Sequence, residues 1–380
     1  MLRRTFLHST GGVALAAPFS SGAAAGPAGA QDSSTPVADG GAPIKLGFDT
    51  YSLRAFRWKA IQLIDFAAAQ KLDTIQISSL DDFESLEPAH LAQVKDHAER
   101  SGLVLDGGIG CVCPTSSSWS GAHGSAEEYI TLGLTVAKAI GARAMRCFLG
   151  SRPDRLGSVP IERHMETVIA VFRSVRSRAL DAGVTIALEN HNGDVSAREV
   201  KTIIEESGKD FTGSNLDTGN PMWMMEDPLQ VLEILGPYVA TTHIRDSVLY
   251  TNPRGAAFQW VALGDGVIDF AKFRRRFVEL CPNAKWQLEV ITGRPPQPLP
   301  YLERDDWKAF PKMLAGDFAQ FLAIERRGRP YAGFMMIADG LKHAPAPYAA
   351  ALKEQQRYDL VRSLDCAKQQ LGVGVRWRTA

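Results

Sequence analysis

The sequence predicts an α/β protein, a (β/α)8 barrel followed by a C-terminal helical extension. From residue 43 onward, apolar runs of strand length alternate about eight times with amphipathic runs of helix length. Such alternation implies parallel strands joined by helical crossovers, and about eight units close into a barrel. An open doubly wound sheet is the alternative, and it favours a glycine-rich turn after the first strand. Here the first strand runs into Thr50-Tyr51-Ser52-Leu53-Arg54, which favours the barrel.

The elements carry local signals in chain order. The predicted strands are residues 44–50, 73–78, 103–109, 142–149, 184–189, 211–217, 239–245 and 285–290. Predicted helices over 87–101, 126–140 and 161–182 each stop at a glycine, which accepts the left-handed conformation past a helix end. Three more helices have N-terminal caps, namely the capping box Ser196–Glu199, Asp227 before Pro228, and Asp269 before residues 270–280.

The first 30 residues read as an export signal and not as part of the fold. Arg3 and Arg4 precede a short apolar run, which is followed by small residues ending in Ala28-Gly29-Ala30. This order is typical of a twin-arginine signal peptide, so we expect the twin-arginine export machinery as a partner and a periplasmic or exported protein. The apolar run is shorter than the roughly 20 residues of a membrane span, so no stable membrane anchor is expected.

The predicted organisation is therefore a signal at residues 1–30, a linker at 31–42, the barrel at 43–326 and a C-terminal extension at 327–380. Two helical patterns follow a proline-rich connection at 294–300. The pattern at 306–324 is the candidate for the eighth barrel helix. We expect the pattern at 347–371 to pack outside the barrel or against a partner such as a second copy of the chain.

Composition excludes several function classes. The 380 residues carry 42 basic and 42 acidic side chains, and 45% are hydrophobic. A disordered chain would have low hydrophobicity and high net charge. A nucleic-acid-binding protein would show a basic excess, so nucleic acid is not an expected partner. The five cysteines form no recognisable disulfide framework.

Polar residues gather at the ends of the last four predicted strands. Each of these strands ends with a charged residue beside an apolar one, in Leu188-Glu189, Leu216-Asp217, His243-Ile244 and Leu288-Glu289. Side chains alternate along a strand, so the apolar neighbours should face the helices and the polar residues should face the barrel interior. The C-terminal ends of barrel strands carry the active site in this architecture. We therefore expect Glu189, Asp217, His243 and Glu289 to converge.

These four side chains predict a metal site. Three carboxylates without a counter-charge repel one another in a partly desolvated site, and a divalent cation removes that cost. Oxygen-rich ligation with one imidazole suits Mn²⁺ or Mg²⁺ first, with Co²⁺ or Zn²⁺ as further candidates.

The sequence resembles the sugar phosphate isomerase/epimerase family, whose members have a xylose isomerase-like barrel. The resemblance lies in residues 186–191 (IALENH), 215–220 (NLDTGN), 242–246 (THIRD) and 263–269 (LGDGVID), and it covers about residues 44–291. It implies that Glu189, Asp217, His243 and Glu289 bind the metal. It also implies that Glu189 and Glu289 move protons through an enediolate intermediate of a carbohydrate substrate.

Other residues are candidates for substrate binding. Arg245 shares the interior side with His243 and can hold substrate oxygens with two donors. His191 shares parity with Glu189, and an extra acid/base, a substrate contact or a loop hydrogen bond would explain it. Asn220 and Trp260 complete the candidate set, because aromatic faces suit the apolar faces of sugars. Further loop residues with sugar-like character are Trp119, His123, Trp223, Tyr250 and Phe258. Asp246 is expected to fix loop geometry.

Departures from the family pattern leave alternatives open. Gln76 stands where the second strand usually carries a glutamate, and residues 110–115 lack the histidine that often follows the third. The leading expectation is an isomerase or epimerase of a free sugar or keto-sugar. The export signal argues against a phosphorylated substrate. A lyase or hydrolase of 3-keto-glycosides would use the same α-proton abstraction. A non-catalytic sugar-binding protein would dispense with the carboxylates, and an abasic-site endonuclease would need more histidines and a basic groove.

Overall fold

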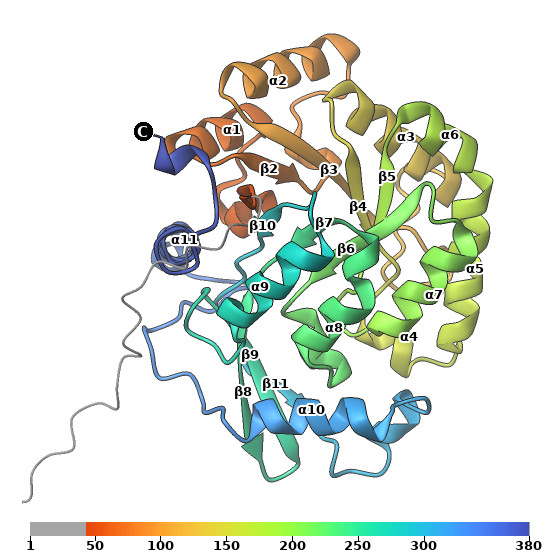
Figure 1. The fold of residues 1–380 in the computed structure, drawn as a ribbon, viewed down its shortest axis with the longest axis vertical. Helices are drawn as coiled ribbons and strands as arrows, with labels where there is room; N and C mark the ends of the chain where they lie inside the picture. The colour runs from red at the N-terminus through yellow and green to blue at the C-terminus, as the bar shows by residue number, and fades with distance from the viewer. Residues whose placement is uncertain (1–42, 380) are drawn as a thin grey trace, which may run out of the picture. The chain divides into compact units, whose positions relative to one another are not determined.

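The computed structural model describes residues 43–379, and these residues form a barrel of eight parallel strands (Figure 1). The strands are β1 (Leu46–Asp49), β2 (Thr74–Ile77), β3 (Val104–Cys111), β4 (Ala144–Phe148), β5 (Thr185–Glu189), β6 (Thr212–Asp217), β7 (Val239–His243) and β10 (Trp286–Leu288). Each pairs with its neighbour in chain order, and β10 pairs with β1. A bridge between Ile244 and Leu288 joins the remaining edges. The predicted fold class and all eight predicted strands are thereby confirmed.

Helices cover the outside of this barrel. They are α1 (Ala60–Ala69), α2 (Pro88–Arg100), α3 (Ala126–Ala139), α4 (Arg152–Leu156), α5 (Ile161–Ser174), α6 (Arg176–Ala182), α7 (Ala197–Ser207), α8 (Pro228–Leu235) and α9 (Phe270–Leu280). The predicted caps form, because the side chains of Ser196, Asp227 and Asp269 each accept a backbone N–H of the following turn. The predicted single helix over 161–182 was wrong. Buried Val175 adopts φ −101° and ψ 4° and divides it into α5 and α6.

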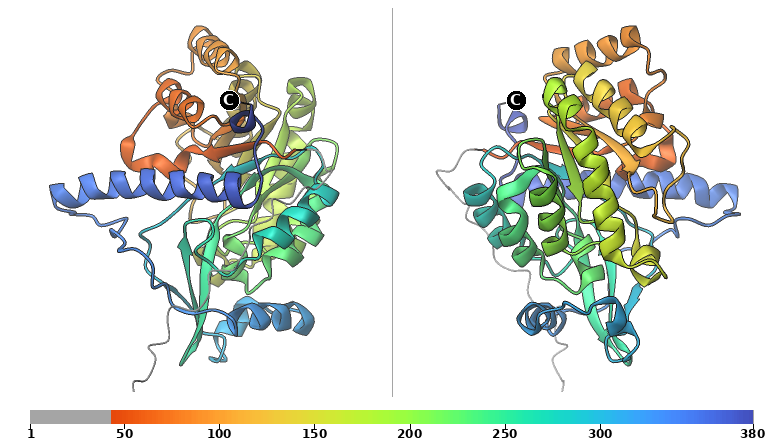
Figure 2. Two further views of the ribbon diagram at one scale, coloured as in Figure 1. Left: turned by 60° about the vertical axis from the view of Figure 1, so that its left-hand side comes forward. Right: turned by 90° about the vertical axis from the view of Figure 1, so that its right-hand side faces the viewer.

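A small antiparallel sheet extends from the barrel and is built from chain segments on both sides of β10. It contains β8 (Asp246–Asn252), β9 (Gly255–Val261) and β11 (Gln297–Leu299), with β9 in the centre. Helix α10 (Ala315–Glu325) lies beside this sheet (Figures 1 and 2). Leu249, Phe258 and Phe321 are fully buried there and belong to a second hydrophobic core. This sheet extends the C-terminal side of the barrel, where the predicted site lies.

Helix α11 (Ala346–Asp365) takes the place of the eighth barrel helix. It lies against β10 and against the 3-10 segment η1 (Thr50–Phe56), and buried Leu360 and Leu364 join the main core (Figure 2). The assignment of the eighth helix to residues 306–324 was therefore wrong. Both segments are amphipathic, and the pattern alone does not show that the chain first leaves the barrel to add β11 and α10.

The last residues of the described chain return to the beginning of the barrel. The backbone N–H of Gly374 donates to the carbonyl of Ile44, and those of Val375 and Arg376 donate to the carboxylate of Asp73. The C-terminal segment is thus bonded to the starts of β1 and β2. Within residues 43–379, no helix has the length and hydropathy needed to cross a membrane. The predicted signal and linker lie outside the described residues.

Candidate metal centre and substrate cavity

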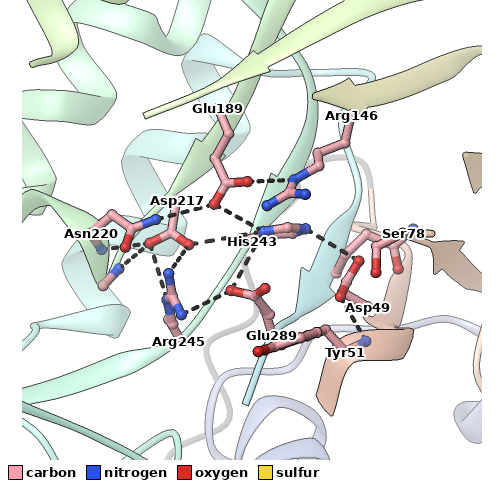
Figure 3. Close-up of polar contacts among 12 residues, drawn as sticks. Asp49, Tyr51, Ser78, Arg146, Glu189, Asp217, Asn220, His243, Arg245 and Glu289 are labelled. Carbon is pink, nitrogen blue, oxygen red and sulfur yellow. Dashed lines mark hydrogen bonds and ion pairs between the residues drawn. The ribbon is translucent and has the colours of Figure 1, made fainter. Parts of the chain in front are cut away.

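Four polar side chains converge at the C-terminal ends of neighbouring strands (Figure 3). Glu189, Asp217 and His243 are the last residues of β5, β6 and β7, and Glu289 directly follows β10. One ligand atom of each lies within 4.8 Å of the others, and all four residues are buried. Their apolar neighbours Leu188, Leu216, Ile244 and Leu288 lie in the main core. The alternation along each strand therefore produces the predicted convergence.

The two ring nitrogens of His243 face different partners. Nδ1 lies 3.3 Å from Glu189 Oε1 and 3.5 Å from Glu289 Oε2. Nε2 lies 3.3 Å from Oδ2 of Asp49, a buried residue at the end of β1 that was not predicted from the sequence. Asp49 is itself oriented, since its Oδ1 accepts the backbone N–H of Tyr51 at 2.9 Å. Burial alone would lower the pKa of His243, but Glu289, Glu189 and Asp49 outweigh it and hold that pKa well above its usual value. With a metal bound at Nδ1, the proton on Nε2 would remain directed at Asp49.

Two arginines pair with the carboxylates of the cluster. Arg146 on β4 donates from Nε to Glu189 Oε2 at 2.5 Å. Arg245 lies 2.7 Å from Asp217 Oδ2 and 2.9 Å from Glu289 Oε2. The Arg245 side chain passes so close to Gly219 that a Cβ there would meet it at 2.7 Å, which explains the glycine of the Asp-Thr-Gly-Asn motif. Arg245 was predicted. Arg146 was missed, although a charged residue inside the apolar run of β4 was a signal for it.

These pairings divide the carboxylates into two kinds. Burial alone would raise the pKa of Glu189, but Arg146 and then His243 outweigh it and hold that pKa well below its usual range. Burial dominates at Asp217, whose pKa rises to about 7 against the opposing charge of Arg245. Burial also raises the pKa of Glu289, again against Arg245. The arginine contact thus keeps Glu189 ionised, whereas burial favours the protonated forms of Asp217 and Glu289.

The chemistry of the residues fits a divalent cation. When all four are ionised, as metal binding requires, Asp49, Glu189, Asp217 and Glu289 carry four negative charges, and the two arginines offset two. Asp217 Oδ2, Glu289 Oε2 and His243 Nε2 are buried without a well-aligned hydrogen bond among the described residues. Ligands on opposite sides of an ion with bonds of about 2.1 Å are about 4.2 Å apart, close to the spacing found here.

A cavity of about 790 Å³ opens above the cluster. The four predicted substrate-binding residues Arg245, His191, Asn220 and Trp260 all line it. Asn220 donates from Nδ2 to Glu189 Oε1 at 3.1 Å. Of the four clustered side chains, Glu289 is the one that lines the cavity.

His191 makes the loop hydrogen bond that the sequence left open, and it also lines the cavity. Its Nδ1 lies 2.7 Å from the carbonyl oxygen of Gly150, and its ring stacks on Phe148 at a centroid distance of 4.0 Å. Burial lowers the pKa of His191 to about 4, so the ring is neutral near pH 7 and Nδ1–H is the donor. The ring edge beyond this bond remains available to the cavity.

The aromatic residues of the loops divide between the cavity and the packing around it. Trp223 and Trp260 line the cavity, whereas Trp119, His123, Tyr250 and Phe258 are absent from its lining. Three aromatic residues that were not predicted also line it, namely Tyr51, Tyr129 and Phe148. The two groups are connected, since His123 and Trp119 pack against Tyr129.

Asp246 fixes the loop that follows the small sheet, as expected. Its carboxylate accepts backbone N–H groups of Ser247, Gly264, Gly266 and Ile268. These bonds tie the loop before α9 to the start of β8, directly after the His243-Ile244-Arg245 segment. Asp246 therefore supports the segment that carries Arg245.

Comparison with known proteins agrees with the barrel fold. A curated relative, 3-oxo-isoapionate decarboxylase of Pectobacterium atrosepticum, is 24% identical over 237 residues, which are 59% of this chain and 78% of that protein. The crystal structure of D-psicose 3-epimerase in the presence of D-fructose superposes with a TM-score of 0.55 at 15% identity, over 87% of this chain and all of that one. The IOLI protein with a bound zinc atom gives a TM-score of 0.50 at 15% identity, over 76% of this chain and all of that one. The family model described as "Xylose isomerase-like TIM barrel" matches residues 64–302, and the chain belongs to this family.

Proposed function

We propose that the protein is a divalent-metal-dependent isomerase or epimerase that acts on a free sugar or keto-sugar through an enediolate. The observation that carries the proposal is the convergence of Glu189, Asp217, His243 and Glu289 beneath a cavity that Glu289 lines. Sugar epimerases among its structural neighbours support the choice of substrate class.

The metal is proposed to be held by these four residues, with Mn²⁺ or Mg²⁺ preferred from the oxygen-rich donor set and Co²⁺ or Zn²⁺ as alternatives. A structural neighbour with bound zinc supports a divalent ion without fixing its identity. When bound, the ion supplies Lewis-acid polarisation of a carbonyl and a neighbouring hydroxyl.

The protein's own side chains then have separable tasks. Glu289 lies at the floor of the cavity with a raised pKa, so it is placed to accept a proton from the carbon next to the substrate carbonyl. Glu189, held as a carboxylate by Arg146, is the candidate for the opposite face in an epimerisation. Asn220 and His191 present polar groups to substrate hydroxyls, and Trp260 presents an aromatic face.

A lyase or hydrolase of 3-keto-glycosides is the second candidate, because the size of the cavity favours it. A volume of 790 Å³ lies in the range of about 300–1,000 Å³ that accommodates drug-sized ligands, and a six-carbon sugar does not fill it. The curated relative is named as a decarboxylase, a lyase that breaks a carbon–carbon bond, whereas the reaction proposed here breaks a carbon–oxygen bond. Abstraction of the α-proton by Glu289 would then be followed by expulsion of the β-substituent.

Proton exchange at the substrate tests what these reactions share. Metal-loaded protein is incubated in D₂O with D-fructose, D-psicose and a 3-keto-glucoside, and deuterium at the α-carbon is followed by NMR. We expect exchange that disappears with a chelator and returns with Mn²⁺. An epimer supports the leading proposal, whereas released aglycone without epimer supports the lyase. Turnover by active protein that contains no divalent metal contradicts both.

Export is proposed from the first 30 residues. Replacing Arg3 and Arg4 by lysine should leave the protein in the cytoplasm, because the twin-arginine pair is the recognised feature. Cell fractionation with and without the double substitution measures this. Equal periplasmic amounts of both forms would contradict the assignment of this signal.

A further inference from the structure

Arginine is the dominant charged residue in the cavity wall. Arg146, Arg152, Arg245 and Arg294 line the cavity from four separate segments, and Glu289 is the acidic residue in the same lining. A cavity for an uncharged sugar needs hydroxyl-binding groups and one or two aromatic faces. Four guanidinium groups therefore require a further explanation.

Arg146 has a donor left for a ligand. Its Nε donates to Glu189 and its Nη1 donates to the carbonyl of Ile109 at 3.4 Å, while its guanidinium lies 4.8 Å over the ring of Phe148. Among residues 43–379, Nη2 of Arg146 donates no hydrogen bond, and the Arg146 side chain is 9% exposed. By contrast, all three guanidinium nitrogens of Arg245 lie close to Asp217 or Glu289. Arg146 therefore presents a nearly buried, unused N–H to the cavity.

The charge balance of the floor depends on this arginine. Four carboxylates and a divalent cation would leave a net charge of −2 and repel an anion. Arg146 and Arg245 bring the loaded floor to zero. At the mouth, Arg54 and Arg294 share the single carboxylate of Asp339, and Arg152 pairs with Asp306. The sum over floor and mouth is then +1, and low-dielectric walls make such a charge effective.

We propose that the substrate is a sugar acid, and that its carboxylate binds the free N–H of Arg146 at the cavity floor. The inference rests on the proposed function, because it places a keto-sugar in this cavity. It adds the charged group that the substrate carries and the residue that selects it. Guanidinium groups are suited to this task, since they remain charged and bind carboxylates in a fixed geometry.

A matched pair of ligands tests the proposal. D-Fructose and 2-keto-D-gluconate share the same keto-sugar skeleton and differ at C1, which is a hydroxymethyl group in one and a carboxylate in the other. Full-length chain loaded with one equivalent of Mn²⁺ is titrated with each by calorimetry at neutral pH. We expect the acid to bind about tenfold more tightly or better, as a charged hydrogen bond predicts. Equal affinities overturn this inference and leave the proposed function standing, whereas binding of neither ligand overturns both.

Substitutions show whether Arg146 or another group causes the preference for 2-keto-D-gluconate over D-fructose. In R146Q the preference should fall to about twofold or less, and R146K should retain the metal yet lose most of the preference, because lysine lacks the planar fork. Metal content and melting temperature are measured for each variant. R294Q is the matched change at the mouth and should keep most of the preference. If the preference persists in both Arg146 variants, the keto acid chelates the metal, and the assignment of the carboxylate to Arg146 is overturned. A preference that is lost only in R294Q also overturns that assignment.

Discussion

Glu189 and Glu226 are both buried glutamates, and their surroundings give them opposite charge states. Glu189 faces Arg146 and His243, which hold its pKa well below the usual range. Glu226 lies in a separate crevice of about 250 Å³ beside α7, where its carboxylate accepts the backbone N–H of Ala197 at 3.1 Å. Burial raises the pKa of Glu226 to about 8. Burial alone thus makes a carboxyl neutral, and cations packed against it make it a permanent anion suited to holding a metal.

The largest effect is expected from E289Q. The amide cannot accept a proton from the substrate, so kcat should fall by about 10³-fold or more while circular dichroism and melting temperature remain close to those of the parent chain. E226Q is the matched control, a buried glutamate outside the cavity, and should retain activity near pH 7. An E289Q variant with near-normal turnover would show that Glu289 is not the group that accepts the substrate proton.

The substitution D49N is expected to cause a smaller loss, and the quantity that falls is the affinity for the metal. The amide places an N–H where Asp49 Oδ2 now faces His243 Nε2, and this favours the tautomer with its proton on Nδ1. Removing such a partner typically costs 10- to 100-fold in metal affinity, which competition with a fluorescent chelator measures. D106N, which changes another buried aspartate of the barrel, should alter stability and leave the affinity unchanged. Unaltered affinity in D49N would show that Asp49 does not orient the ring.

The raised pKa of Glu226 predicts that the stability of the protein depends on pH. Its folded pKa of about 8 exceeds the usual glutamate pKa of 4.5, so the folded state keeps a proton that the unfolded chain releases across this window. The free energy of unfolding should therefore fall as pH rises from 4.5 to 8, by up to about 1.4 kcal/mol per unit from this group. Denaturant unfolding of E226Q should lack that contribution. If the free energy of unfolding fell equally with pH in the parent chain and in E226Q, the raised pKa of Glu226 would be contradicted.

The smallest effect is expected from W260F. The Trp260 ring lies 4.2 Å from the Arg245 guanidinium, and its indole N–H donates to the carbonyl of Gly219 at 3.3 Å. Phenylalanine keeps a ring and loses this bond, so KM should rise about threefold with kcat little changed. Steady-state kinetics separate the two constants. A change in kcat alone would place Trp260 among the groups that act on the transition state.

The parts of the site that were predicted from sequence obey a simple periodicity. Glu189, Asp217, His243 and Glu289 each adjoin a leucine or isoleucine at a strand end, and alternation alone directs them inward. Arg146 and Asp49 also end or lie within strands that were correctly located. Their roles depend on which residue lies opposite across the barrel, and a single strand carries no information about that.

The missed fold elements have a related cause. The hairpin of β8 and β9 lies in the segment after the seventh strand, which was expected to be a loop. The eighth barrel helix was assigned to the segment that contains α10, and not to α11, because both helices are amphipathic. Phe321 of one and Leu360 of the other are equally buried, in different cores. Local pattern shows that a face is covered, and only long-range contacts show by what.

The bonds of Gly374, Val375 and Arg376 to Ile44 and Asp73 also govern the timing of folding. The helix that seals the barrel between β10 and β1 is delivered by residues 346–365, so the first strand waits for the last helix during synthesis. Contacts over about 300 residues of sequence are slow to form, and until then Leu46 and Trp286 lack part of their cover. Docking of this segment therefore requires that the first strands of the barrel have come together with the last residues of the described chain.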